Sequence, residues 1–250
     1  MLIHGSASDL RIWQPLYSAL ALHHRVIAYS RRHHWPNPPP FDKYSFGNDV
    51  DDLTEILGAL SISSAHLIAH SAGGFVAVEF AKRYSEKARS LTLFDPNAPG
   101  ILTPPEVAIV DSERGPWLES VRKSLSAGDD KTALRYLFKP LVGSKRLPRW
   151  FGAMANDNVA ALKRQFASPS APPTVSCDDV KRYPKSILVL QGENSPRAFQ
   201  IVNRAFQRCA RDAQLETIDH CGHIFQLDAP GRVGKRITEF LSGVDKLLSF

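Results

Sequence analysis

Residues 66–75 read HLIAHSAGGF, and this stretch decides how the rest of the chain is interpreted. Residues 67–69 are apolar enough to end a buried strand, and the proline-free residues 72–84 are typical of a helix. Ser71 therefore lies at the apex of a predicted strand-turn-helix. A serine in that position can be a nucleophile held on a sharp turn, or it can simply cap an ordinary helix.

The residues on either side of Ser71 favour the sharp turn. Such a turn leaves room only for small side chains two residues before and two residues after the serine, as the motif G-x-S-x-G expresses. Gly73 fills the second position, and Ala69 fills the first with one additional methyl group. The motif alone does not separate the two interpretations, so the remaining members of a catalytic set must be sought elsewhere in the chain.

The composition is that of an ordinary globular protein. With 250 residues and 43% hydrophobic content, the chain can bury the core of one domain that carries an inserted subdomain. No apolar run reaches the length of a membrane span, and no signal-type segment opens the sequence, so we expect a cytoplasmic protein. The three cysteines, Cys177, Cys209 and Cys221, are widely spaced and lack a CxxC pair, which predicts reduced thiols rather than disulfides or a zinc site.

Neither the charge nor the histidines indicate a nucleic-acid partner or a metal ion. The net charge is +6, but the basic residues occur as short scattered pairs, so we expect no nucleic-acid partner; at most the charge favours anionic substrates. His33 and His34 are adjacent, so their side chains tend to diverge, and no acid or cysteine pattern completes a metal site. The oligomeric state is not predicted.

Strands and helices are expected to alternate in the first part of the chain. Predicted strands end near residues 3, 28, 69 and 94, and helical spacing recurs over residues 13–20 and 48–60. This alternation favours an α/β fold with a mostly parallel open sheet that has helices on both faces.

The alternation is interrupted and then resumes. Residues 97–173 offer only helical segments, around 116–127, 131–138 and 156–166, and they close with the proline-rich residues 168–173. We therefore expect a helical cap subdomain at 97–173, inserted into a core formed by residues 1–96 and 174–250. The core regains its pattern with predicted strands at 187–190 and 215–218, and with helices at 196–209 and around 233–240.

Four short motifs with polar residues follow predicted strands. They lie at the carboxyl ends of the strands, where such a sheet carries its functional loops. They are Gly5-Ser6, Ser71, Asp95 and His223. A serine hydroxyl becomes a strong nucleophile when a histidine takes its proton, and a third group, usually a carboxylate, holds that histidine in the right tautomer. The chain contains all three residue types in a plausible order.

Taken together, these motifs resemble an α/β-hydrolase fold enzyme with a helical cap. The resemblance rests on His4-Gly5, the elbow at residues 69–73, Gly192-Glu193 and Gly222-His223. It implies that Ser71 is the nucleophile and His223 the general base. It further implies that the backbone N–H groups of Ser6 and Ala72 form an oxyanion hole, with no cofactor.

The identity of the acid stays open between two carboxylates. Many family members carry an aspartate three residues after the glycine that follows the late strand, but here that position is Ser195. Asp95 is our choice, because some relatives supply the acid from the strand that follows the elbow; Glu193 is the alternative. A different pair, Asp219 and His220, fits the family pattern less well.

Several other residues depart from the family or allow two interpretations. The loop at residues 29–36 lacks the aspartate and paired glycines usual in relatives. Relatives also generally begin with two more strands than this sequence does, so we expect either that the sheet is short at this edge or that the sequence is incomplete. His4 and His70 are expected to be hydrogen-bonded scaffold residues; the alternative for His70, which lies beside Ser71, is contact with a substrate. Trp117, Trp150 and Phe151 either line a pocket beneath the cap or pack the core of the cap.

The resulting prediction is a serine hydrolase that cleaves an ester, lactone or thioester of a small, mostly apolar molecule through an acyl-enzyme. Serine at position 71 argues against the epoxide-hydrolase and haloalkane-dehalogenase branches, which attack through a carboxylate. The alternatives are carbon–carbon bond cleavage or a non-hydrolytic reaction on the same triad, and a ligand-binding receptor with little or no turnover.

Overall fold

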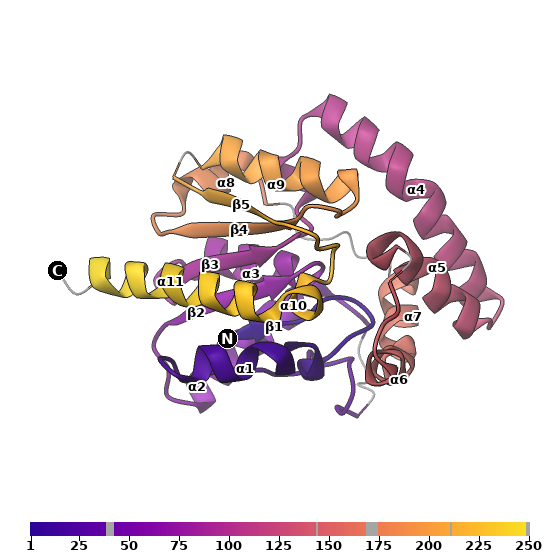
Figure 1. Cartoon of the computed structure of the whole chain (residues 1–250), viewed down its shortest axis with the longest axis horizontal. Helices are drawn as coiled ribbons and strands as arrows, with labels where there is room; N and C mark the ends of the chain where they lie inside the picture. Colours follow the sequence, from indigo (N-terminus) through magenta and orange to yellow (C-terminus); the bar gives the residue numbers. More distant parts are fainter. Residues whose placement is uncertain (39–42, 144, 169–174, 211, 249–250) are drawn as a thin grey trace.

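A single parallel sheet forms the centre of the computed structural model, which describes residues 1–38, 43–143, 145–168, 175–210 and 212–248 (Figure 1). Its five strands are hydrogen-bonded in the order β1-β2-β3-β4-β5, and each neighbouring pair is parallel. The strands are β1 (Leu2–Ile3), β2 (Ala65–His70), β3 (Ala88–Phe94), β4 (Ile187–Gly192) and β5 (Gln214–Ile218). The predicted fold class is confirmed.

Apolar side chains project from both faces of the sheet, because successive residues of a strand point to opposite sides. In β1, for example, Leu2 packs in one buried cluster and Ile3 in the other. The cluster around Leu2 is covered by α1 (Gln14–Ala21), α10 (Phe225–Asp228) and α11 (Pro230–Leu248). The cluster around Ile3 is covered by α2 (Phe46–Ala59), α3 (Gly73–Arg83), α8 (Cys177–Arg182) and α9 (Arg197–Cys209).

The strand expected at residues 26–28 is reduced to a single bridge. Ala28 pairs with Leu2, and the Leu2 N–H donates to the Ile27 carbonyl at 2.8 Å, but no regular strand forms. The reason is that β1 is only two residues long, so it offers few backbone groups for pairing. The prediction of a full strand is therefore wrong, although the segment does lie beside β1.

Between β3 and β4 the chain forms a group of helices that lies at one side of the sheet (Figure 1). They are α4 (Pro104–Ser126), α5 (Asp130–Val142), α6 (Arg149–Asp157) and α7 (Val159–Ala167), preceded by the short helix η2 (Pro99–Ile101). Helix α4 begins earlier than expected, because Thr103 and Glu106 form a capping box, and Pro116 therefore lies inside the helix. Of the proline-rich segment at 168–173, only Ser168 is among the described residues.

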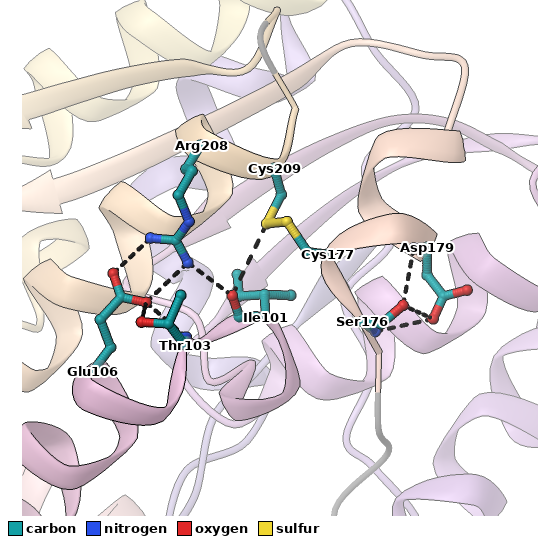
Figure 2. The surroundings of a disulfide bond; sticks show 8 residues. All are labelled: Ile101, Thr103, Glu106, Ser176, Cys177, Asp179, Arg208 and Cys209. Carbon is teal, nitrogen blue, oxygen red and sulfur yellow. Dashed lines mark hydrogen bonds and ion pairs between the residues drawn. A yellow bond between two sulfur atoms is a disulfide. The ribbon is translucent and has the colours of Figure 1, made fainter.

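Two of the three cysteines form a disulfide, which corrects the prediction of reduced thiols (Figure 2). Cys177 begins α8 and Cys209 ends α9, and their Cα atoms are 5.0 Å apart despite a sequence separation of 32. The pairing arises because these two helices pack side by side, which spacing in the sequence does not reveal. Cys221 is buried and unpaired. The Arg208 guanidinium beside the disulfide donates to the Ile101 carbonyl at 3.0 Å and thereby ties α9 to η2.

No helix in the described part of the chain combines the length and apolar character that a membrane crossing requires.

Candidate active site

Ser71 lies on the tight turn between β2 and α3, with a positive φ of 52°. Backbone bonds hold it there: its N–H donates to the Phe94 carbonyl at 2.9 Å, and its carbonyl accepts from Gly74 at 2.9 Å. A Cβ at Gly73 would lie 2.5 Å from the Ile3 carbonyl oxygen, and one at Gly74 would lie 2.6 Å from Pro96. The small residues after the serine are therefore required by close packing, as the elbow motif predicts.

Asp95 and His223 are in direct contact. The imidazole Nδ1–H of His223 donates to Oδ2 of Asp95 at 3.0 Å, and both side chains are fully buried. The other ring nitrogen, Nε2, is buried and has no hydrogen-bond partner among the described residues. Burial, as the larger cause, and the positive charge of Arg114 together lower the pKa of His223 to about 3, so the imidazole is neutral at pH 7. A neutral imidazole with an unoccupied Nε2 can accept a proton.

Two further side chains, Ser195 and Asn203, donate hydrogen bonds to Asp95. The Ser195 hydroxyl donates to Oδ2 at 2.5 Å, and the Asn203 amide donates to Oδ1 at 2.8 Å. Burial raises the pKa of Asp95 to about 7, and these two hydrogen bonds act in the opposite direction by favouring the charged carboxylate. The sequence did not reveal either role, although Ser195 occupies the position at which many family members carry the acid.

The alternative acid and base lie apart from this pair. The Glu193 carboxylate accepts from the backbone N–H of His220 at 2.7 Å and forms no described contact with His223. The His220 side chain is 89% exposed, and neither it nor Asp219 lines the cavity that contains Ser71. Asp95, and not Glu193, is thus the carboxylate that contacts His223.

His70 and His4 are both hydrogen-bonded within the fold, as expected of scaffold residues. The Nε2–H of His70 donates to the His223 carbonyl at 3.0 Å, and the two rings are 4.7 Å apart. His4 donates from Nδ1 to the Gly5 carbonyl at 2.9 Å and accepts at Nε2 from the Arg31 N–H at 3.0 Å. Burial, as the largest cause, lowers the pKa of His70 to about 3 and the pKa of His4 well below its usual range, so both rings are neutral.

The loop after β1 approaches the elbow closely. A Cβ at Gly5 would lie 3.1 Å from the Cβ of Ser71, so this glycine permits the contact. The backbone N–H groups of Ser6 and Ala72 donate to no described residue, while the Ser6 hydroxyl donates to Gln165 of α7 at 2.9 Å.

Arg31, in the loop that departs from the family pattern, contacts the loop after β1. Its guanidinium is fully buried and pairs with Asp49 at 2.7 Å. It also donates to the Tyr44 hydroxyl at 2.8 Å and to the Gly5 carbonyl at 3.0 Å. A buried ion pair needs such additional hydrogen bonds to offset the loss of hydration. The arginine thus holds the loop that carries Ser6, a role for which no sequence signal was recognised.

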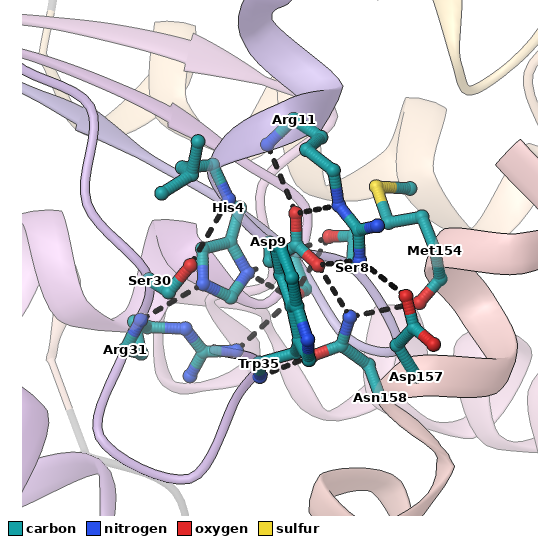
Figure 3. A network of polar contacts seen from close by, with 12 residues as sticks. His4, Ser8, Asp9, Arg11, Ser30, Arg31, Trp35, Met154, Asp157 and Asn158 are labelled. Carbon is teal, nitrogen blue, oxygen red and sulfur yellow. Dashed lines mark hydrogen bonds and ion pairs between the residues drawn. The ribbon is translucent and has the colours of Figure 1, made fainter. Parts of the chain in front are cut away.

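A polar network joins the same loop to the helices between β3 and β4 (Figure 3). Asp9 accepts from Arg11 at 2.6 Å and from the Asn158 amide at 2.7 Å. Arg11 continues to Asp157 at 2.8 Å, and the Asn158 side-chain oxygen accepts from the Trp35 backbone at 2.9 Å. Asp9 and Asn158 are fully buried, so these bonds fix α6 and α7 relative to the loop after β1.

A cavity of about 400 Å³ lies beside Ser71. Ser71, His70 and His223 contribute polar groups to its wall, and most of the remaining wall is aromatic or aliphatic: Ile12, Phe46, Phe75, Trp117, Leu118, Leu137, Phe138, Leu141, Phe151, Phe166, Phe199 and Ile224. Of the three cap aromatics considered from the sequence, Trp117 and Phe151 line the cavity, whereas Trp150 does not. The cavity has the size and apolar character of a small-molecule site.

Within the described residues, no group of three histidine, cysteine or acidic side chains is arranged to hold a metal ion. His34, one of the two adjacent histidines, is buried, and its Nε2 lies 3.3 Å from the Arg31 guanidinium.

Comparison with known proteins agrees with this fold. Residues 1–236 match the family described as Alpha/beta hydrolase family. A curated relative from Pseudomonas putida, the dihydrolipoyllysine-residue acetyltransferase component of an acetoin cleaving system, is 24% identical over 251 residues. This match covers 96% of the chain and 62% of the relative, so the chain spans less than two thirds of that protein's length.

Solved structures share the fold at low sequence identity. An esterase from Exiguobacterium antarcticum has a TM-score of 0.80 and 15% identity, with 96% of this chain and 90% of the other covered. An enol-lactonase from Burkholderia xenovorans LB400 has a TM-score of 0.77 and 17% identity, with the same coverage. The family match over nearly the whole chain and the shared fold lead to one conclusion: the chain belongs to the alpha/beta hydrolase family.

Proposed function

We propose that the protein is a serine hydrolase that cleaves an ester, lactone or thioester of a small, mostly apolar molecule through an acyl-enzyme. Ser71 is the nucleophile, His223 the general base and Asp95 the orienting acid. The observation that carries the proposal is the 3.0 Å hydrogen bond from His223 to Asp95, which leaves Nε2 unpartnered in the wall of the cavity that contains Ser71.

The reaction follows from the roles of these groups. Nε2 of His223 takes the hydroxyl proton of Ser71 as the oxygen attacks the substrate carbonyl, and Asp95 stabilises the imidazolium that forms. The N–H groups of Ser6 and Ala72 stabilise the tetrahedral oxyanion, at about 3 kcal/mol for each donor. The imidazolium then protonates the leaving group, and a water molecule, activated by the same histidine, hydrolyses the acyl-enzyme. No cofactor takes part.

The substrate class follows from the cavity and from the helices that cover it. We regard residues 97–173 as a cap subdomain on a core of residues 1–96 and 174–250, with Trp117 of α4 and Phe151 of α6 facing the substrate. The esterase and the enol-lactonase with the same fold are consistent with a carbonyl substrate. The cytoplasmic location stays a prediction, and the Cys177–Cys209 disulfide weighs against it because such bonds are rare in cytosolic proteins.

Labelling with a fluorophosphonate probe, followed by peptide mapping, tests the nucleophile and the base. We expect modification of Ser71, loss of labelling in Ser71→Ala, and a loss of ester hydrolysis on the order of 10⁶-fold in that variant. His223→Gln should abolish labelling, whereas the matched control His220→Gln should retain it. Absence of labelling in the folded wild-type protein would refute the hydrolase and favour a binding role.

A second matched pair tests the acid. Asp95→Asn removes the charge that stabilises the imidazolium, so we expect a loss in kcat on the order of 10⁴-fold. Glu193→Gln should leave kcat within about threefold of the wild type, because a solvent-exposed contact contributes little. The reverse order of effects would make Glu193 the acid.

A further inference from the structure

Arg114 of α4 brings a positive charge into the wall of the cavity. Its Nη1 donates to the side-chain oxygen of Asn97 at 2.8 Å. The centre of the guanidinium lies 5.1 Å from the centre of the Phe199 ring, which in turn lies 4.2 Å from the His223 ring. The cation and the proposed base thus both lie close to the ring of Phe199.

The guanidinium of Arg114 has no carboxylate partner among the described residues. No described ion pair includes it, and its hydrogen-bond partner Asn97 is neutral. The neighbouring acid Glu113 lies 3.6 Å from Arg197, while Asp111 is exposed and reaches Arg114 only through a longer-range Coulombic interaction. By contrast, the fully buried Arg31 pairs with an aspartate.

One terminal donor of Arg114 is available to a carboxylate. Nη2 donates to no described residue, whereas Nε, which also lacks a partner, is buried too deeply for a ligand to reach it. A charged N–H donor of this kind forms a strong hydrogen bond to a carboxylate oxygen. Burial lowers the pKa of Arg114 to about 10, so the group remains protonated at neutral pH. Arg114 is partly buried, so its cation loses part of its hydration without gaining a counterion, and an anionic ligand would offset that cost.

We propose that the substrate of this hydrolase is itself an anion: a half-ester, lactone acid or thioester whose free carboxylate binds Nη2 of Arg114 while its reacting carbonyl lies at Ser71. This inference rests on the proposed serine hydrolase activity and narrows its substrate class. The apolar wall of the cavity would then hold the carbon chain between the two ends. Arg114 acts by positioning the substrate and determines specificity; it does not take part in proton transfer.

The comparison of matched substrates and variants tests this assignment. The substrates are the monoethyl esters of succinate, glutarate and adipate, together with ethyl hexanoate as an uncharged ester of the same chain length as monoethyl adipate. The variants are Arg114→Gln, Arg114→Lys and the control Arg197→Gln, which removes an exposed guanidinium outside the cavity.

In the wild type, we expect kcat/KM to be higher for at least one half-ester than for ethyl hexanoate. Arg114→Gln should lower kcat/KM for that half-ester by about 10- to 100-fold, as the loss of charge-assisted hydrogen bonds implies, and should change it less than about threefold for ethyl hexanoate. Arg114→Lys should give an intermediate loss, and Arg197→Gln should change neither. Equal losses on charged and uncharged esters, or no preference for any half-ester in the wild type, would overturn the inference.

Equilibrium binding separates this inference from the proposed activity. Ser71→Ala protein should bind the preferred half-ester, and Ser71→Ala/Arg114→Gln should bind it about 10- to 100-fold more weakly. Arg114-dependent binding without any hydrolysis by the wild type would support the carboxylate site and refute the hydrolase. Ser71-dependent hydrolysis of uncharged esters without Arg114-dependent binding would support the hydrolase and refute the carboxylate site. If Arg114→Gln fails to fold, the Arg114→Lys variant and the wild-type substrate preference carry the test.

Discussion

Replacement of Ser195 with alanine should shift the pH dependence of hydrolysis to higher pH. The Ser195 hydroxyl donates to Oδ2 of Asp95 at 2.5 Å, the same oxygen that accepts from His223. A hydrogen bond to the charged form of an acid lowers its pKa, so its removal raises the pKa of Asp95. The proposed mechanism needs the ionised carboxylate, because only the anion stabilises the imidazolium. Activity should therefore appear only at a higher pH in Ser195→Ala.

The magnitude of the shift follows from the strength of the lost bond. A hydrogen bond to a charged group contributes about 1.5 to 3 kcal/mol, and one pKa unit corresponds to about 1.4 kcal/mol. Burial holds the pKa of Asp95 at about 7 in the wild type. Because Asn203 still donates to Oδ1 in the variant, the lower part of the range applies. The ascending limb of kcat/KM should thus move upward by about one pH unit.

The assay is the dependence of kcat/KM on pH between about 5 and 10, with an uncharged ester as substrate, so that no ionisation of the substrate contributes. Thr92→Val is the matched control. Thr92 is fully buried in β3 and its hydroxyl has no partner among the described residues, so the limb should stay in place. Circular dichroism and thermal unfolding would establish that both variants are folded. An unchanged limb in Ser195→Ala, or one shifted to lower pH, would refute the assignment of Asp95 as the acid.

Two further predictions concern stability. The Cys177–Cys209 disulfide closes a loop across a sequence separation of 32. Replacement of both cysteines with serine should therefore lower the free energy of unfolding by about 3 to 4 kcal/mol. An unchanged free energy of unfolding in urea titrations would contradict this prediction. Gly73→Ala places a methyl group 2.5 Å from the Ile3 carbonyl oxygen and should cost about 1 to 3 kcal/mol. The control is Gly243→Ala in α11, where the added methyl group meets open space, and this change should instead stabilise the protein by up to about 1 kcal/mol. Similar effects of the two changes on the free energy of unfolding would argue against the close contact between residue 73 and the Ile3 carbonyl.

Periodicity and turn motifs were sufficient to predict most of the core. The elbow at Ser71 and the alternation of strands and helices depend on local patterns, and the structure confirms a parallel sheet with helices on both faces. The strand expected at residues 26–28 fails because its formation depends on the length of its neighbour β1, which a local pattern does not contain.

The features that the sequence left open, predicted wrongly or did not indicate depend on tertiary contacts. Asp95 and Glu193 both follow strands, so only the packing of the loops shows which carboxylate touches His223. The disulfide depends on the way in which α8 and α9 pack, not on the spacing of the cysteines. Arg114 lies in a helix with a weak apolar pattern, and only the structure places it in the cavity wall.

The placement of Asp95 has a consequence for the order in which the site assembles during synthesis. Ser71 and Asp95 lie at the ends of β2 and β3, neighbouring strands joined only by α3, so one short contiguous unit carries the proposed nucleophile and acid. Contacts between residues close in sequence form faster than distant ones. A growing chain can therefore pair these strands early, whereas His223 is synthesised 128 residues after Asp95. The proposed base therefore joins the site last, and a chain interrupted before residue 223 would carry the proposed nucleophile and acid but no histidine to accept the serine proton.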